Sequence, residues 1–161
     1  MEPRFNLFSS ATAAKVGKRF YGASKALEES TLPKATQHLL SLRASQINGC
    51  GWCVDIHTKE AAAAGETELR LHLVAAWRHS SVFTDAERAA LALTEEGTRI
   101  GDGREGVSDE TWAAVRKHYD DDQVGALVCL VSMINAANRM SVIAGNVGGS
   151  YKPGMFAGMD E

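Results

Sequence analysis

Apolar residues recur at helical spacing along most of the chain, and no stretch shows the strict alternation that predicts a half-buried strand. Residues 11–29 are rich in Ala and Lys, and they place Val16 and Phe20 at candidate inward positions of a first helix. Pro33 suits the first turn of a second helix, because its missing N–H costs nothing there. This second helix is expected to reach about Gln46.

Turn and capping signals divide the middle of the chain into further helices. Asn48-Gly49 is a break signal, and a third helix is expected over about 50–65, with a glycine as its C-terminal stop. A fourth helix is expected over 69–77. Residues 84–87 fit a capping box, in which a Thr and a Glu satisfy free backbone donors, and they open a fifth helix.

The last part of the chain predicts two helices and an irregular tail. One helix is expected over 108–119, and the long final one begins at about 120–123 and ends near Gly145. The tail, 145–161, contains five glycines and is expected to drape over the domain or over a neighbouring subunit. Together these patterns predict a single all-α domain spanning residues 1–161, built as a helical bundle.

Length, composition and charge narrow the class of protein. A chain of 161 residues can bury a core without disulfides or metals. The formal net charge is -3 with no basic stripe, so we expect no nucleic-acid partner. The first six residues contain no apolar signal region, and the longest apolar stretch, 125–134, is shorter than the roughly 20 residues that span a bilayer. We therefore expect a cytoplasmic protein without a membrane partner.

The chain contains three cysteines, an odd number that does not suggest a secreted disulfide framework. Cytosolic thiols are reduced by default, so the close pair Cys50 and Cys53 is expected to be catalytic, redox-sensing or metal-binding. The third, Cys129, lies in an apolar run, and we expect it to be a core residue.

The segment from Cys50 to His57 carries the chemistry. If it is helical, Cys50, Cys53 and His57 share one face, because residues three, four and seven apart do so. The two cysteines could then form a disulfide, since their Cα atoms would lie about 5 Å apart. The start of a helix favours a thiolate, and a neighbouring imidazole can take the thiol proton.

Three interpretations of this segment remain open from the residues alone. The first is redox dithiol chemistry. The second is a zinc site, with Cys50, Cys53, His57 and the upstream His38 as four ligands, in a metal-binding or non-catalytic helical protein. The third is a pair of buried structural cysteines. A c-type haem motif is excluded, because Val54 rather than a His follows the second cysteine.

Residues 39–61 resemble the AhpD-like alkylhydroperoxidase and carboxymuconolactone decarboxylase family, and residues 134–140 match it more weakly. With the helical background, the resemblance covers roughly residues 10–145. It implies an AhpD-like all-α fold, no cofactor, and a homo-oligomer that is a trimer or a hexamer. The carboxymuconolactone branch generally lacks the cysteine pair, so ring-lactone decarboxylation fits this chain poorly.

The resemblance also implies a peroxidase with assigned residue roles. Cys53 would attack the peroxide, Cys50 would be the resolving thiol, and His57 would take part in a proton relay. A lipoyl-type or thioredoxin-like dithiol would then reopen the disulfide. The family pattern has a Glu twelve residues before the first cysteine, where this chain has His38. A His can pass a proton near neutral pH, but it cannot supply a fixed negative charge.

Several polar residues lie outside this constellation. Asp55 and Glu60 are expected to face solvent. Asn135, Asn138 and Arg139 interrupt the apolar last helix, and we expect them to hydrogen-bond within the core or across a subunit contact rather than to act in catalysis.

Overall fold

The computed structural model describes residues 2–102 and 106–156, and the end of the predicted tail, 157–161, lies outside them. No described residue is in a strand, so the predicted all-α class is confirmed. The seven α-helices of the described residues are α1 (Ala11–Glu28), α2 (Lys34–Ile47), α3 (Gly51–Ala63), α4 (Glu68–Leu73), α5 (Asp85–Thr98), α6 (Asp109–His118) and α7 (Asp121–Ala144). Two 3-10 helices, η1 (Leu7–Ser9) and η2 (Val74–His79), complete the order.

Every α-helix of the described residues except α2, which follows Pro33, begins where a side chain accepts from a free backbone N–H group. Thr84 and Glu87 form the predicted capping box of α5, and Ser108 caps α6 as expected. Asp120 and Gln123 form a second capping box at the start of α7. The predicted fourth helix is wrong in part, because the chain changes from α4 into the tighter η2 after Leu73.

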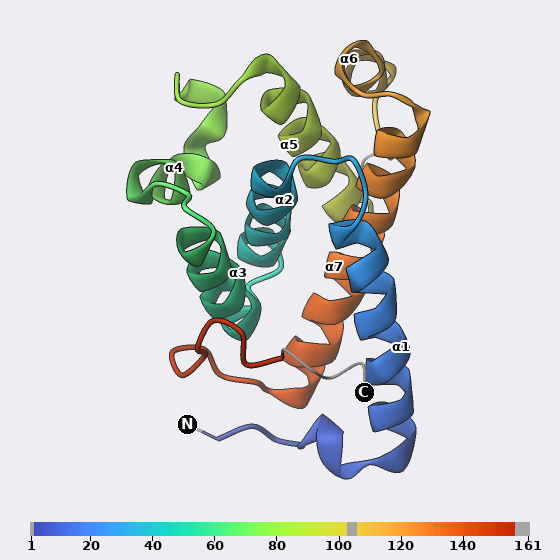
Figure 1. Cartoon of the computed structure of the whole chain (residues 1–161), viewed down its shortest axis with the longest axis vertical. Coiled ribbons are helices and arrows are strands. Elements are labelled where there is room, and N and C mark those ends of the chain that lie inside the picture. The colour runs from blue at the N-terminus through green and yellow to red at the C-terminus, as the bar shows by residue number, and fades with distance from the viewer. Residues whose placement is uncertain (1, 103–105, 157–161) are drawn as a thin grey trace.

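The helix α2 lies at the centre of the bundle, between α3 on one side and α5 and α7 on the other (Figure 1). It contributes three leucines that are almost fully inaccessible, Leu39, Leu40 and Leu42. Each is a large apolar side chain whose burial stabilises the fold by roughly 2 kcal/mol. This packing fixes the end of α2, where the turn leading to the cysteines begins.

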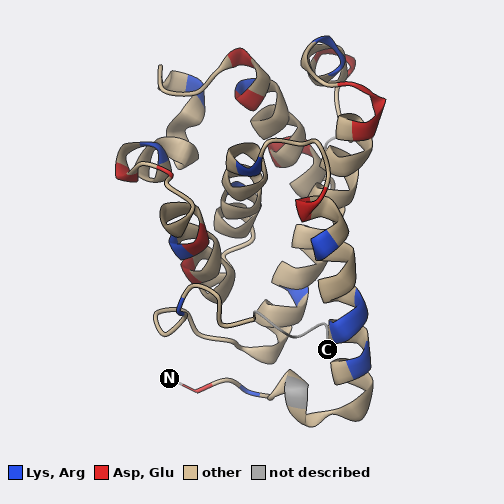
Figure 2. Ribbon diagram, in the orientation of Figure 1, with Lys and Arg blue, Asp and Glu red and all other residues tan. Residues whose placement is uncertain are grey.

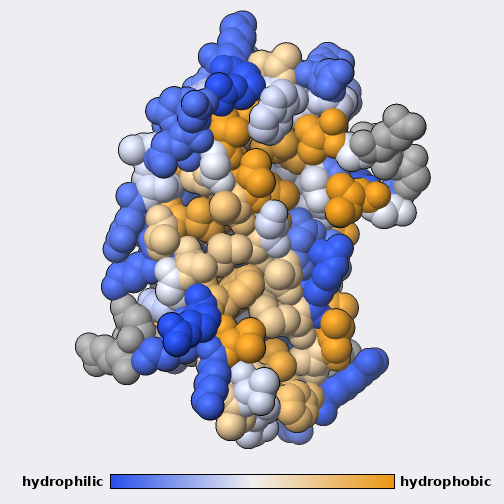
Figure 3. Space-filling model, turned by 90° about the vertical axis from the view of Figure 1, so that its right-hand side faces the viewer, coloured by the Kyte–Doolittle hydropathy of each residue, from blue (hydrophilic) through white to orange (hydrophobic). Residues whose placement is uncertain are grey.

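The helix α7 is long and apolar enough to cross a membrane by length and composition alone, and 39% of its most apolar window is buried within the bundle. Apart from two aspartates in its first turn and Arg139 near its end, it carries no charge, whereas both signs are spread over the other helices (Figure 2). The face that includes α1 and α7 shows a broad band of apolar side chains between charged groups (Figure 3). This helix therefore has a second apolar face that the described residues leave open.

The tail begins at Gly145, which ends α7 with a left-handed backbone conformation (φ +72°). Residues 146–156 then turn back, without regular helix, toward α3 (Figure 1). The prediction that this segment is irregular and drapes over the domain is confirmed for the described part.

Candidate active site

The cysteines lie at the start of α3, directly after the turn that ends α2. Gly49 has a positive φ (+65°), and the Cys50 N–H then donates to Ser45 O (3.0 Å). Cys50 is the N-cap of α3, and its sulfur accepts from the backbone N–H of Cys53 (3.2 Å). The chain therefore places a sulfur atom where a helix supplies free donors and positive potential.

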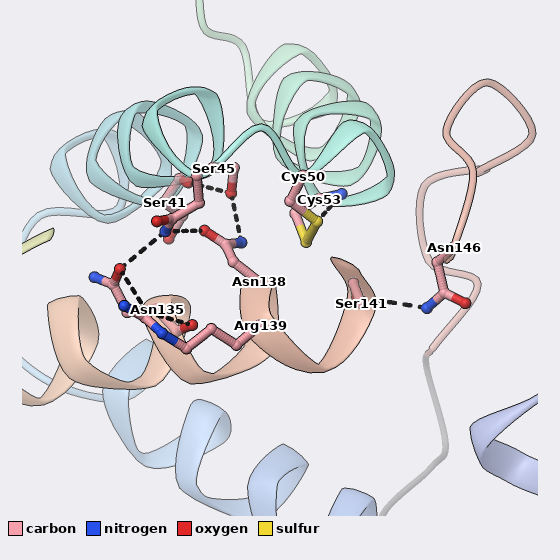
Figure 4. The surroundings of a disulfide bond; sticks show 10 residues. Ser41, Ser45, Cys50, Cys53, Asn135, Asn138, Arg139, Ser141 and Asn146 are labelled. Carbon is pink, nitrogen blue, oxygen red and sulfur yellow. Dashed lines mark hydrogen bonds between the residues drawn. A yellow bond between two sulfur atoms is a disulfide. The ribbon is translucent and has the colours of Figure 1, made fainter. Parts of the chain in front are cut away.

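Cys50 and Cys53 form a disulfide with their Cα atoms 5.3 Å apart, as the spacing predicted. The disulfide faces α7 (Figure 4). Both residues are almost fully buried, with exposed fractions of 2% and 4%. The pair is thus shielded from bulk solvent within this chain.

A network of amides and hydroxyls, to which the Arg139 guanidinium also donates, holds the turn that precedes the cysteines. The Asn48 Nδ2 group donates to Asn135 Oδ1 (2.9 Å) and to Asn138 Oδ1 (2.8 Å). Asn138 Nδ2 donates to Ser45 Oγ (3.0 Å), as Figure 4 shows. Asn135 Nδ2 donates to Thr98 Oγ1 on α5 (3.0 Å). The two α7 asparagines therefore hydrogen-bond within the core, which is one of the two arrangements expected for them.

His57 lies one helical turn after Cys53 on α3 and is half-buried. Burial, followed by repulsion from His38, lowers the pKa of His57 to about 4, although Glu60 opposes this by raising it. A neutral imidazole results at physiological pH, and such a group can accept a proton from a thiol one turn away.

His38 lies on α2, the helix against which α3 packs most extensively. Burial also lowers the pKa of His38, while the carboxylates of Glu60, Glu28 and Glu66 raise it. Since the charge of His38 acts on His57, the structure brings together the two histidines that the sequence singled out.

The tail docks on the outer face of α3 through Asp55 and Lys59. The carboxylate of Asp55 accepts from the N–H groups of Gly149 (2.7 Å) and Tyr151 (3.0 Å). Lys59 pairs with Asp55 (2.6 Å) and donates to Tyr151 O (2.9 Å). Although burial raises the pKa of Asp55, these donors lower it below its usual range. The expectation that Asp55 faces solvent is therefore wrong.

Glu60 is likewise covered by the tail rather than free in solvent. Its Oε1 atom accepts from the Tyr151 hydroxyl and from the N–H of Gly154 (3.0 Å). Tyr151 is 4% exposed, and its ring meets Trp52 edge-on at 6.0 Å between centroids. The expectation of a solvent-facing Glu60 was wrong, because the residues that cover it lie about ninety positions later in the sequence.

A shallow depression lies between the tail and α3, with a volume of about 470 Å³. Its lining comprises Gly51, Val54, Asp55, Thr58, Lys59, Gly148 and Gly149. Gly148 lies so close to the Gly51 carbonyl that a Cβ there would overlap it. The tail thus reaches the first turn of the cysteine helix.

Cys129 is exposed on α7, so the expectation that it is a core residue is wrong. Among residues 2–102 and 106–156, no three His, Cys, Asp or Glu side chains are grouped so that they could hold one metal ion. The zinc interpretation therefore finds no support in this arrangement, in which both cysteines are used in the disulfide.

Known proteins resemble this chain over most of its length. The model of the carboxymuconolactone decarboxylase family matches residues 14–96. The uncharacterized protein YdfG of Bacillus subtilis (strain 168) is 40% identical over 122 residues, which cover 76% of this chain and 82% of YdfG.

Solved structures share the fold. ATU0492 of Agrobacterium tumefaciens, a protein of unknown function described as a candidate antioxidant defence protein AhpD, is 30% identical, with a TM-score of 0.86 over 93% of this chain and 100% of that one. An uncharacterized peroxidase-related protein from Ralstonia eutropha JMP134, described as an alkylhydroperoxidase AhpD core, has a TM-score of 0.72 at 19% identity. The match covers 84% of this chain and 72% of that one, and at this identity it supports the fold alone. Because the family model spans more than half of the chain, the protein belongs to the carboxymuconolactone decarboxylase family and has an AhpD-like helical fold.

Proposed function

We propose that this protein is a thiol-dependent peroxidase that uses the Cys50–Cys53 pair and a histidine proton relay. The observation that carries this proposal is the disulfide at the N-terminus of α3, one helical turn before His57 on the same helix. A dithiol in this position has the positive helix end and the neutral base that a reactive thiolate requires. The AhpD-like description of ATU0492 adds support.

The first half of the reaction consumes the peroxide. His57 accepts the thiol proton of Cys53, and the resulting thiolate attacks one peroxide oxygen. The O–O bond breaks, a sulfenic acid forms on Cys53, and the alkoxide leaving group takes a proton to become an alcohol. Sulfur is oxidised by two electrons and the peroxide is reduced by two. We assign the attack to Cys53 because it lies one turn from His57.

The second half regenerates the pair. The Cys50 thiol condenses with the sulfenic acid, which closes the disulfide and releases water. An external dithiol of the lipoyl or thioredoxin type then reopens the disulfide by exchange and is itself oxidised. Since both cysteines are almost fully buried, a slender reductant suits this site better than a broad protein surface.

A turnover assay with cysteine variants tests the proposal. The protein is supplied with cumene hydroperoxide and dihydrolipoamide, and peroxide loss is followed over time. We expect Cys53→Ser and Cys50→Ser to abolish turnover and Cys129→Ser, which alters an exposed thiol on another helix, to leave it unchanged. Equal turnover by all three variants would overturn the proposal.

We further propose that the protein acts in the cytoplasm as a homo-oligomer, with neither nucleic acid nor membrane as a partner. Support comes from the open apolar face of α7, on which Val142 and Ile143 are 49% and 76% exposed. Light scattering should give a mass above the 17.3 kDa of one chain. Ile143→Glu should reduce that mass, whereas Leu69→Glu, at an exposed position on α4, should not. A monomer at micromolar concentration would contradict the proposal.

A further inference from the structure

Glu60 is a carboxylate that the reaction described above does not use, although it lies beside the histidine that the reaction needs. It follows His57 by three residues on α3, so the two side chains are neighbours on one helix face. Cys53 is seven residues away, which is two turns along the same helix. Glu60 is therefore one turn closer to the imidazole than to the attacking thiol.

The tail prevents this carboxylate from turning outward to water. Tyr151 and Gly154 both donate to its Oε1 atom, and the buried Tyr151 ring is itself packed against Trp52. Burial, and then the hydrogen bond and charge of Glu60, raise the pKa of Tyr151, so its hydroxyl remains a donor over the physiological range. A surface glutamate would not require two donors from a segment so distant in sequence.

Few charged groups act on His38 and His57. Repulsion from His38 on α2 opposes protonation of His57, and Glu60 on its own helix favours it. Besides Glu60, the groups acting on His38 are Glu28 of α1, Lys34 of α2 and Glu66 before α4. Glu60 is thus the one carboxylate, among the described residues, that acts on both histidines.

We propose that Glu60, clamped by Tyr151 and Gly154 of the tail, is a positioning residue that stabilises His57 in its protonated form when this imidazole accepts the Cys53 proton. The inference rests on the proposed function and assigns a role to the tail as well. One proton moves from the Cys53 sulfur to the imidazole, and no electrons are transferred in this step. A thiolate, an imidazolium and the Glu60 carboxylate then alternate in charge along α3.

The direction in which the pH profile of Cys53 reactivity shifts distinguishes stabilisation of the imidazolium from a direct effect of the Glu60 charge on the thiol. If Glu60 stabilises the imidazolium, its removal disfavours the thiolate–imidazolium pair and makes the thiol react at higher pH. If Glu60 acted only as a negative charge near the sulfur, its removal would favour the thiolate and move the reaction to lower pH. The two accounts therefore predict opposite shifts.

The experiment compares Glu60→Gln with the matched control Asp55→Asn in the reduced, full-length protein. Each change removes one negative charge from α3 and keeps an oxygen that can accept from the tail. The rate of iodoacetamide alkylation at Cys53 is measured against pH, with Cys129 replaced by Ser in every sample. We expect Glu60→Gln to move the profile about one unit to higher pH, which is about a tenfold slower rate on the acidic side. Asp55→Asn, which does not act on His57, should superimpose on wild type.

A second readout needs neither peroxide nor alkylation. Histidine titrations followed by NMR should show the midpoint of His38 falling in Glu60→Gln and unchanged in Asp55→Asn. An unchanged or acid-shifted alkylation profile in Glu60→Gln, or an unmoved His38 midpoint, would overturn the inference. Peroxide turnover by the wild-type protein tests the proposed function separately, because alkylation and NMR need no peroxide.

Discussion

The two sides of the cysteine helix are held by opposite kinds of polar contact. On the α7 side, amides fix the turn before the cysteines, in a buried network joining Asn48, Asn135 and Asn138, and its one charged member is an arginine, which does not titrate near neutral pH. On the tail side, the contacts are carboxylates and a lysine, with Asp55 and Glu60 accepting from residues 149–154. One side has no group that titrates near neutral pH, and the other consists largely of charges.

This difference assigns the two sides different tasks. A network in which no group titrates near neutral pH keeps the same hydrogen bonds while protons move nearby, so it can hold the cysteine turn. A charged contact changes the affinity of its neighbours for protons, so it can set the state of His57. Variants on the α7 side should therefore change stability without a pH dependence, and removal of the tail-side charge that acts on His57, as in Glu60→Gln, should change pH profiles.

Among the variants considered, Asn138→Ala, on the α7 side, is expected to change the free energy of unfolding most. Asn138 is fully buried, and its loss removes one of the two hydrogen bonds that Asn48 Nδ2 donates and the one that Ser45 Oγ accepts. We expect the free energy of unfolding to fall by about 3 kcal/mol, because each unsatisfied buried group costs about 1–3 kcal/mol. Urea denaturation at pH 7 and pH 6 measures it.

The matched control for this variant is Asn146→Ala, since Asn146 makes only a marginal contact with Ser141 (3.5 Å) at the end of α7 (Figure 4). It should cost less than about 0.5 kcal/mol. If Asn138→Ala lowered the free energy of unfolding more at pH 6 than at pH 7, a group that titrates in this range would have to take part in the network.

Lowering the pH is expected to reduce the free energy of unfolding by an intermediate amount, because His57 takes up a proton on unfolding. Its folded pKa of about 4 lies below the unfolded value of 6.5, so the unfolded state binds more protons between these values. The contribution of His57 to the free energy of unfolding is fully present above pH 6.5 and is lost as the pH approaches 4. Allowing for solvent screening of a half-buried group, we expect this loss to be about 2 kcal/mol. His38, with a lowered pKa, contributes with the same sign.

Urea midpoints from pH 7.5 to 4.5 measure this slope, and His57→Gln should flatten it. The carboxylates with lowered pKa values, which include Asp55 and Glu95, lose their contribution only at more acidic pH. Parallel slopes for wild type and His57→Gln would contradict the assignment of a neutral, half-buried His57.

The smallest effect on global stability is expected from Gly148→Ala, which acts on the tail without changing a charge. An added Cβ would overlap the Gly51 carbonyl, and backbone cannot move aside cheaply. The tail should detach locally, at a cost to global stability of about 1 kcal/mol or less. Amide hydrogen exchange should accelerate at Gly149 and Tyr151, whose N–H groups donate to Asp55.

Gly125→Ala is the control for this change, because a Cβ at Gly125 on α7 meets open space. It should stabilise the protein by about 0.5–1 kcal/mol through the lower backbone entropy of Ala. Unchanged exchange at Gly149 in Gly148→Ala would show that the tail tolerates the overlap.

Local signals predicted most of the fold. Caps, prolines and glycines act within one turn of the chain, so the starts of α5, α6 and α7 and the break at Asn48-Gly49 follow from the sequence. The cysteine pair and its disulfide are equally local, because the two partners are three positions apart in the sequence.

The errors concern features that depend on distant residues. Val128 and Cys129 are exposed whereas Leu127 and Leu130 are buried, but all four are apolar, so hydropathy alone could not show which face of α7 packs inward. The sequence predicts that Asp55 and Glu60 face solvent, and this prediction is wrong because their hydrogen-bond partners lie in the distant tail. A single buried aromatic in a glycine-rich segment, Tyr151, is the signal that could have indicated docking.

The most direct test of the central claim is one turnover of the reduced protein with one equivalent of cumene hydroperoxide, followed by peptide mapping. In wild type, the account predicts a new disulfide joining Cys50 to Cys53 within one chain and one alcohol formed per disulfide. In Cys50→Ser, it predicts a sulfenic acid on Cys53 that dimedone captures. Dimedone capture at Cys50 in Cys53→Ser at an undiminished rate, or oxidation confined to Cys129, would contradict the account.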